Sequence, residues 1–250
     1  MIIREKQMET LATITVRSFE DRMIEHLRGL FPNHAEALSE SGLREVIQLG
    51  IERAAGYGLT AERVVCHYID LMFLLGSGFD KDLQVPWAGE ILQASAIPDQ
   101  FQKIDKLYGR AMEYLDQVAG PKNEHIKQVL QRLHTEAGRP FLPPDPKDFA
   151  SDLTARLAQL YPQKHQAVGE ERLRQLVRSG EAEAQAGGFQ SPEARALYIG
   201  LMFALGSGFA SDPQFPWAQA ARDAPAGMAE RQRVEMLLEA ARRYMQRWLA

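Results

Sequence analysis

The chain has 250 residues, 45% of them hydrophobic and 25% charged, and its formal net charge of −4 argues against nucleic acid or an anionic membrane as partner, because both require a face rich in Lys and Arg. The single cysteine, Cys66, excludes an intramolecular disulfide and a cysteine-rich zinc site. Neither a signal peptide nor an apolar run near the ~20 residues of a membrane helix is apparent, so we expect a cytoplasmic protein without membrane insertion.

Four helices are predicted in the first half of the chain. They cover residues 7–30, 41–55, 61–75 and 100–118. In the first, apolar residues recur close to a 3.6-residue period until Pro32 ends the helix. Thr60 is placed to cap the third, whose sequence is apolar nearly all round, as is typical of a fully packed central helix. The passage between the third and fourth helices, through Pro86 and Trp87, is expected to be irregular.

A connecting segment over residues 119–144 separates this half from the next. Its first part can form a short helix, whereas RPFLPPDP is a stiff, extended tract that cannot be helical. Asp145 followed by Pro146 has the pattern of a helix cap and first turn. The second half is therefore expected to begin at residue 145.

The second half repeats the first. Placing each position over the one 130 residues later aligns the two without a gap from Phe19/Phe149 to Trp87/Trp217, and YIDLMFLLGSGFDKDLQVPWA at 68–88 returns as YIGLMFALGSGFASDPQFPWA at 198–218. A period this long that occurs twice indicates a duplicated domain. We therefore expect an all-α fold of two tandem copies, about four helices each, packed as one body about a pseudo-two-fold axis. Copy 1 would span 1–118 and copy 2 would span 145–250.

The repeated GSGF motif has two interpretations. A glycine loop that binds phosphate lies before a helix, where backbone N–H groups face the anion. Here the glycines follow an apolar helix, at its negative end. They are better explained as left-handed caps at Gly76/Gly206 or Gly78/Gly208, with Phe79 and Phe209 folding back onto the preceding turn.

Polar and aromatic residues recur after both motifs. They are Asp82, Gln84 and Trp87 in the first half and Asp212, Gln214 and Trp217 in the second. Such residues either anchor a corner of the fold or form a recognition surface, since Trp is favoured at binding hot spots. Trp248, near the end of the chain, is a third aromatic candidate.

The titratable residues give no motif of catalysis or metal binding. The six histidines show no HxxxH or HExxH spacing, so no metal and no cofactor are expected. Cys66, next to His67, is interpreted as a small buried thiol. Asp70 stands in an apolar helix where the second half has Gly200. It is expected to pair with an arginine between the copies, or else to line a polar pocket.

Three stretches, FEDRMIEHLRGLFP, GIERAAGYGLTAERVVCHYIDLMFLLGSGFD and PWAGEIL, carry a family resemblance. They resemble a group of bacterial proteins encoded beside type VI secretion spike and effector genes, over residues 19–92 and, through the repeat, 149–218. The resemblance implies an accessory role, either as an immunity protein that occludes a toxin or as a chaperone or adaptor that loads an effector. It transfers no functional residues.

These observations predict a non-enzymatic factor that binds a protein partner. Its expected contact residues are Trp87, Trp217, Trp248, Asp82, Asp212, Gln84 and Gln214. One alternative is a helical bundle that binds a small molecule or lipid, with a cavity lined by Met72, Met112, Met202, Met236 and Met245. The other is an enzyme, for which Asp70 with His67 nearby is the cluster to inspect.

Overall fold

The computed structural model describes residues 5–135, 141–142, 147–225 and 227–247, and every regular element within these ranges is a helix. The predicted all-α class is confirmed. In the first half the α-helices are α1 (Glu5–Leu30), α2 (Pro32–Ala37), α3 (Glu40–Gly56), α4 (Glu62–Leu75), α5 (Pro86–Gln93) and α6 (Gln100–Ala119). A connecting helix, α7 (Glu124–Thr135), follows. In the second half they are α8 (Phe149–Leu160), α9 (Pro162–Val168), α10 (Glu170–Ala186), α11 (Pro192–Leu205), α12 (Pro216–Arg222) and α13 (Glu230–Gln246).

The estimate of about four helices in each half is too low, because the short helices that begin at prolines were missed. Pro32 and Pro86 occupy the first turns of α2 and α5. Proline has no N–H to lose at that position, and its fixed φ suits the start of a helix. Pro32 therefore separates two helices, and the passage after Pro86 that we expected to be irregular is helical.

The start of α4 differs from the prediction. Ala61 precedes the helix, and no side chain of its own caps it. Instead the Gln100 side chain, at the start of α6, accepts hydrogen bonds at 2.9 Å from the backbone N–H groups of Thr60 and Ala61. In the second half Ser191 caps α11, as its sequence predicts, and Glu230 takes the role of Gln100 by accepting from the Ser191 N–H at 2.7 Å.

The first helix described in the second half is α8. Asp145 and Pro146 lie outside the described residues. Asp148 precedes α8 and accepts a hydrogen bond from the Ser151 N–H at 3.2 Å, which makes it the N-cap. An aspartate is favoured there because its carboxylate satisfies an otherwise unpaired N–H group at the positive end of the helix dipole.

The core is built around α4 and α11, whose Tyr68 and Tyr198 are buried. Both helices approach a neighbour closely at a glycine. A Cβ placed on Gly50 of α3 would lie 2.5 Å from Ile69, and one on Gly180 of α10 would lie 2.7 Å from Ile199. Such contacts are too short for a side chain, so glycine sets the distance between the packed helices.

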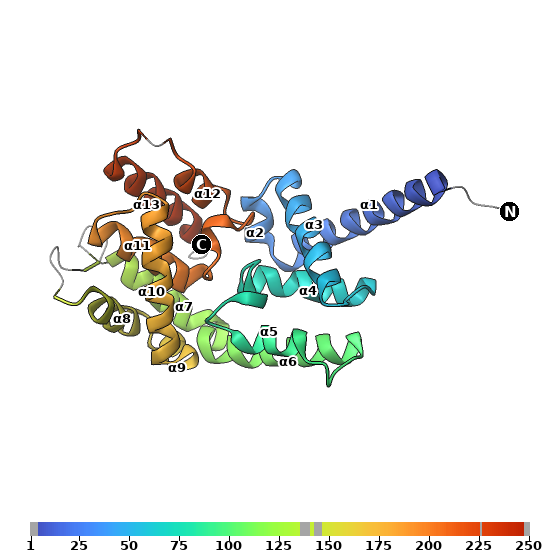
Figure 1. Ribbon diagram of the computed structural model, residues 1–250, viewed down its shortest axis with the longest axis horizontal. Helices are drawn as coiled ribbons and strands as arrows, with labels where there is room; N and C mark the ends of the chain where they lie inside the picture. Colours follow the sequence, from blue (N-terminus) through green and yellow to red (C-terminus); the bar gives the residue numbers. More distant parts are fainter. Residues whose placement is uncertain (1–4, 136–140, 143–146, 226, 248–250) are drawn as a thin grey trace.

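The two halves lie side by side, with the first on the right of Figure 1 and the second on the left. α6 runs beneath the first half toward the second and packs against α9. The N-terminal part of α1 extends away from the rest of the molecule. Within the described residues, no helix combines the length and apolar character needed to cross a membrane.

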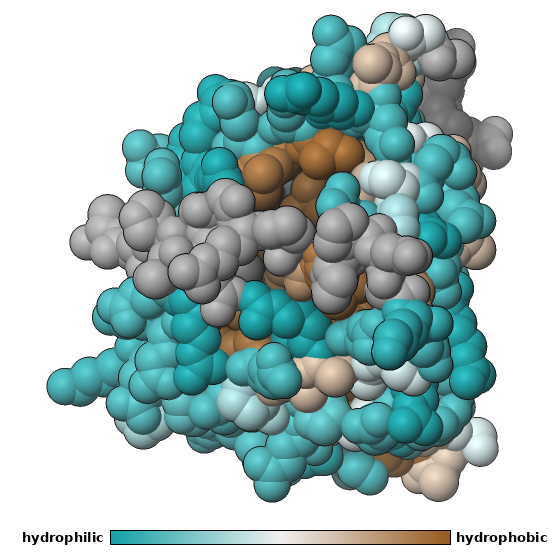
Figure 2. Space-filling model, turned by 90° about the vertical axis from the view of Figure 1, so that its left-hand side faces the viewer, coloured by the Kyte–Doolittle hydropathy of each residue, from teal (hydrophilic) through white to brown (hydrophobic). Residues whose placement is uncertain are grey.

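The face formed by the second half is largely hydrophilic. Figure 2 shows an apolar area in its hollowed centre, bordered by hydrophilic side chains.

Candidate functional site

Two helix ends face each other where the halves meet. α4 ends at Gly76 and α11 ends at Gly206, with φ of 94° and 106°. A Cβ on Gly76 would lie 3.0 Å from the Leu205 carbonyl oxygen, and one on Gly206 would lie 3.3 Å from that of Leu75. Glycine is therefore required twice over, for its backbone conformation and for the close approach of the two helix ends.

The proposed helix stop is thus correct in position but differs in detail. Gly76 and Gly206 have ψ near 149° and 148°, outside the left-handed helical region of a Schellman cap, and Gly78 and Gly208 have negative φ. Phe79 and Phe209 do fold back. The ring centroid of Phe79 lies 5.0 Å from that of Tyr68, and the ring centroid of Phe209 lies 5.0 Å from that of Tyr198.

Asp212 of the second half binds the helix end of the first. Its carboxylate accepts hydrogen bonds from the Ser77 N–H at 2.7 Å and the Ser77 hydroxyl at 2.6 Å. Gln214 donates from its amide to the Met72 carbonyl oxygen at 2.8 Å, an acceptor in the last turn of α4. The Met72 carbonyl oxygen also accepts from the Gly76 N–H, so the second half adds a further hydrogen bond to the last turn of α4 and binds the residue after Gly76.

Asp82 and Gln84 of the first half make the equivalent contacts to the end of α11. Asp82 accepts from the Ser207 N–H at 2.9 Å, and Gln84 donates to the Met202 carbonyl oxygen at 3.0 Å. Each aspartate also accepts from the backbone N–H of the glutamine two residues later, at 2.9 Å in both halves. The two loops therefore exchange equivalent hydrogen bonds across the contact between the halves.

This arrangement argues against direct recognition of a partner by Asp82, Gln84, Asp212 and Gln214. All four are buried, with exposures of 2–5%. Burial also raises the pKa of Asp212, against the hydrogen bonds from Ser77 that favour its charged form. Polar groups this deeply buried hold the fold together through their hydrogen bonds.

The tryptophans occupy half-buried positions. Trp87 packs beside Tyr114, with the Arg110 guanidinium over its ring at 5.8 Å. Trp217 packs between Phe215 and Tyr244. Each therefore covers the core with part of its ring and exposes the rest. Trp248 lies outside the described residues.

Asp70 has a different partner from the arginine we expected. Its Oδ1 lies 2.8 Å from Nε2 of His26, which comes from α1. Asp70 is 3% exposed, and its burial raises the pKa of its carboxyl, while the His26 hydrogen bond acts in the opposite direction. The interpretation as a contact between copies is wrong, since both residues belong to the first half.

Cys66 completes a cluster with these two residues. Single donor atoms of His26, Cys66 and Asp70 all lie within 4.8 Å of one another. A pocket of about 450 Å³ opens at this place between α1 and the start of α4. Its lining includes His26 and Cys66, so the expected buried thiol is only half-buried and faces a cavity.

The cluster is a poor nucleophilic site in this state. Burial, with the nearby charges of Asp70 and Glu62, raises the pKa of the Cys66 thiol to about 11. The thiol is therefore protonated near neutral pH, whereas a nucleophilic cysteine requires a thiolate. His67, the residue suspected of acting with Asp70, is instead packed beside Tyr108, with ring centroids 5.3 Å apart.

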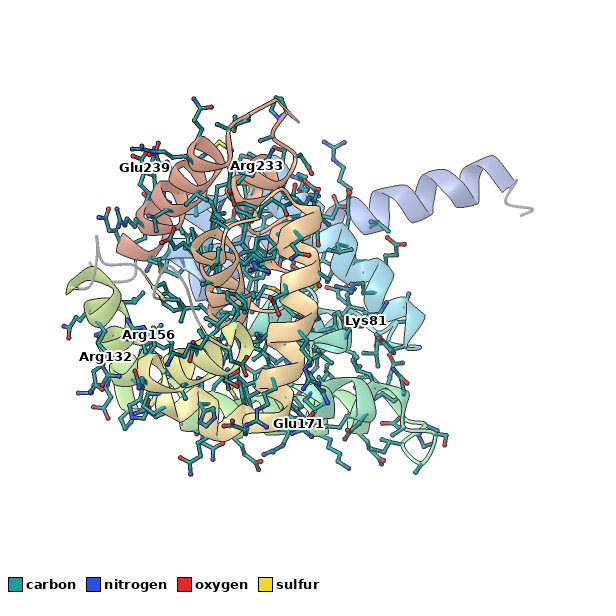
Figure 3. The ribbon with its side chains drawn as sticks, turned by 60° about the vertical axis from the view of Figure 1, so that its left-hand side comes forward. Lys81, Arg132, Arg156, Glu171, Arg233 and Glu239 are labelled. Carbon is teal, nitrogen blue, oxygen red and sulfur yellow. The ribbon has the colours of Figure 1, made fainter. Side chains whose placement is uncertain are left out.

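The equivalent place in the second half is built differently. The positions 130 residues after His26, Cys66 and Asp70 hold Arg156, Ala196 and Gly200. Arg156 projects from α8 (Figure 3), and its guanidinium lies 5.3 Å from the centre of the Phe141 ring. A Cβ on Gly200 would lie 3.7 Å from Phe141. The connecting segment thus supplies a ring where the first half has a polar cluster.

Sequence motifs missed this cluster for a clear reason. His26 lies 44 residues before Asp70 and reaches it only through the packing of α1 on α4. The available signal was the spacing of Cys66 and Asp70, which places both on one face of a helix.

The methionines of the proposed ligand cavity lie elsewhere. Met72 and Met202 are fully buried, and Met112, Met236 and Met245 pack at the edge of the core.

Searches of protein-family models, curated proteins and solved structures found no match to this chain.

Proposed function

We propose that this chain is a non-enzymatic, protein-binding accessory factor built from a duplicated helical unit, and that the N-terminal extension of α1 is its main partner-binding element. The observation that carries the proposal is the projection of this helix beyond the body of the molecule (Figure 1). The two copies would pack about a pseudo-two-fold axis, which the crossed hydrogen bonds of Asp82 and Asp212 support.

The extension of α1 lies outside the repeated unit. α1 has 26 residues, whereas α8, its equivalent, has 12 and begins at Phe149. Phe149 corresponds to Phe19, so the first 14 residues of α1 precede the aligned start of the repeat. Among residues 16–20, Val16 is 44% exposed, Phe19 is half-buried and Glu20 is buried.

An isolated helix of this length is marginal in water, and most helices are stabilised by packing an apolar face. The sequence of the extension continues the apolar spacing of α1 through Leu11 and Ile14. An amphipathic helix of this kind fits a hydrophobic groove on another protein, which would contact residues three and four apart along one face. A groove of that kind on a partner is the occupant that we propose.

The class of partner comes from the resemblance to proteins encoded beside type VI secretion genes. It indicates a secreted effector or a spike component, bound either for loading or for neutralisation. Trp87 and Trp217 would contribute at the rim of the contact, since half-exposed aromatic side chains are favoured in interfaces.

The test is co-purification of the full chain with the products of its neighbouring genes. We expect one of them to remain bound at micromolar concentration. A variant that begins at Phe19, as α8 begins at Phe149, should lose only the helical signal of the removed residues and keep its unfolding midpoint, but bind at least 10-fold more weakly. Failure of the full chain to retain any neighbour, or undiminished binding by the shortened chain, would contradict the proposal.

Single substitutions distinguish a partner-binding role from a structural role for each tryptophan. Trp87→Ala and Trp217→Ala should each lower stability modestly, because a half-buried ring is removed. If binding falls while the fold remains, the ring contacts the partner; if only stability falls, it belongs to the corner. The distinction needs both measurements on the same variant.

A second candidate function rests on the pocket beside Cys66. Its volume of about 450 Å³ is in the range of small-molecule sites, and apolar Phe19 and Met23 line it together with charged Arg22. A small ligand bound there would be detected by a rise in unfolding midpoint that Cys66→Trp, which fills the space, abolishes. The protonated thiol argues for binding without nucleophilic catalysis.

A further inference from the structure

We infer that His26, Cys66 and Asp70 form a binding site for one Zn²⁺ ion between α1 and α4. The three side chains supply one nitrogen, one sulfur and one oxygen donor, with donor atoms all within 4.8 Å of one another. The site is separate from the α1 extension proposed to bind a partner, and its test does not depend on that proposal.

The donor set selects the metal. Thiolate and imidazole together favour Zn²⁺ over the hard cations Mg²⁺ and Ca²⁺, which prefer oxygen ligands alone. Zinc is commonly held by three protein ligands with a fourth position left for water or another group. His26, Cys66 and Asp70 are such a set of three.

The helices bring the donors close to the required arrangement. Cys66 and Asp70 are four residues apart on α4, so their side chains share one face, and His26 projects to them from α1. Zinc bonds of roughly 2.0–2.3 Å place tetrahedral ligands about 3.3–3.8 Å apart. The donor atoms of His26 and Asp70, now 2.8 Å apart in a direct hydrogen bond, would have to separate by about 0.5–1 Å to admit the metal. The sulfur of Cys66, within 4.8 Å of both, would have to approach by about 1 Å.

Burial of Asp70 supplies an electrostatic reason for a cation here. This carboxyl is 3% exposed within a helix that is otherwise apolar on its buried side, and His26 is its hydrogen-bond partner. A buried carboxylate is costly unless an opposite charge offsets it. A bound dication would offset it more completely than the hydrogen bond with His26 does.

The pocket provides the fourth coordination position. Cys66 and His26 both line it, and Arg22, Glu62 and Arg63 surround its charged part. Arg22 and Glu62 already form an ion pair at 2.6 Å, which reduces the positive charge that the metal meets on entry. A water molecule, or an anionic group attracted by Arg63, would complete the coordination.

The second half serves as an internal comparison. All three ligand positions change together there, to Arg156, Ala196 and Gly200. A structural requirement shared by the halves would keep at least one of them, as it keeps Asp82/Asp212 and Gln84/Gln214. The packing that the two halves share therefore does not require these three residues.

The experiment is a titration of the metal-free full chain with Zn²⁺ and Co²⁺ at pH 8. We expect one Zn²⁺ per chain and a rise in unfolding midpoint. The Co²⁺ form should show a thiolate-to-metal charge-transfer band, which reports Cys66 directly. Binding should release a proton to the buffer, because a cysteine ligates zinc as its thiolate.

Three variants and one matched control define the site. Cys66→Ala, Asp70→Asn and His26→Gln should each weaken Zn²⁺ binding by about 100-fold or more, since even loss of an outer-shell partner costs 10–100-fold. Cys66→Ala is the decisive variant for folding, because the second half holds alanine at this place. His165→Gln is the control. It removes another histidine paired with a carboxylate, Glu170 at 3.0 Å, and should leave binding unchanged.

Two results would overturn the inference. One is the absence of stoichiometric Zn²⁺ binding at micromolar metal. The other is binding that persists in Cys66→Ala, or that is lost equally in His165→Gln, since either would place the metal elsewhere on the chain.

Discussion

The contact between the halves made by Asp82, Gln84, Asp212 and Gln214, here called the joint, differs from the pocket between α1 and α4 in how far its residues are repeated. At the joint, residues 130 positions apart are identical and make the same contacts, as Asp82 and Asp212 do. At the pocket, none of the three cluster residues of the first half is kept in the second. Mutual packing therefore constrains the joint in both halves, whereas the pocket has been free to change in one of them.

The hydrogen bonds that the two halves contribute to the joint are not fully equivalent. Asp212 receives the Ser77 N–H and the Ser77 hydroxyl, whereas Asp82 receives the Ser207 N–H with no hydroxyl contact among the described hydrogen bonds. The loop of the first half has an additional anchor, since Asp80 pairs with Arg53 at 3.2 Å and accepts from the Tyr57 hydroxyl at 2.8 Å. The corresponding positions in the second half hold Ala210, Glu183 and Gly187.

Replacing Asp82 or Asp212 should weaken the joint and give the largest loss in the free energy of unfolding. Asp212→Ala leaves the buried Ser77 N–H and the Gln214 N–H without their acceptor, and we expect a loss of about 4 kcal/mol in the free energy of unfolding. Asp82→Ala should cost about 3 kcal/mol, because it loses fewer strong bonds. Urea unfolding of the two variants measures the difference.

We expect Asp212→Ala to lose more stability than Asp82→Ala. Asp223→Ala is a suitable control, because Asp223 lies at an exposed position beside Arg222. A loss below 1 kcal/mol at both Asp82 and Asp212 would show that the crossed hydrogen bonds do not hold the halves together.

Alanine at the facing helix ends should have an intermediate effect. Gly76→Ala requires a side chain at φ of 94° and places its Cβ 3.0 Å from the Leu205 carbonyl oxygen, so we expect a loss of about 2 kcal/mol. Gly206→Ala should cost slightly less, since its closest contacts are 3.3 Å. Gly78→Ala, with negative φ and open space around it, should be nearly neutral in the same thermal unfolding series.

A pH-dependent difference between the halves should be the smallest effect. His34 packs beside Phe73, and its counterpart Lys164 packs over Phe203. Burial lowers the pKa of His34 from 6.5 to about 4 and that of Lys164 from 10.5 to about 8. In both cases the unfolded chain binds a proton more readily than the folded chain.

The sign follows from this ordering. His34 contributes a loss of stability as the pH falls from about 6.5 to about 4, because the unfolded state takes up the proton first. At pH 5 the contribution is about 1–2 kcal/mol. The measurement is the difference in unfolding free energy between pH 7 and pH 5 for the wild type and for His34→Gln. An equal difference in the two proteins would contradict it.

Much of the fold could be read from the sequence, because its signals are local. The apolar run of α4, the glycine stops and the 130-residue repeat of identical residues depend on residues near one another or on direct comparison of the halves. The short helices after Pro32 and Pro86 were missed because proline ends one helix and starts another equally well. The cap of α4 was assigned to Thr60 because the Gln100 side chain that replaces it comes from another helix.

The candidate sites were harder to predict, because tertiary packing decides them. Asp82 and Asp212 recur for a reason that only the joint reveals, since each satisfies the backbone of the opposite half. His26 becomes the partner of Asp70 through the crossing of α1 and α4, and nothing in the sequence around either residue indicates the other.

The crossed hydrogen bonds at the joint have an evolutionary consequence. Two surfaces that complete each other reciprocally are the interface of a symmetric dimer, in which every substitution appears twice. Once two such units are joined in one chain, a substitution alters a single unit and leaves its neighbour intact. The first half carries His26, Cys66 and Asp70 where the second carries Arg156, Ala196 and Gly200, a difference that a homodimer of identical subunits cannot have.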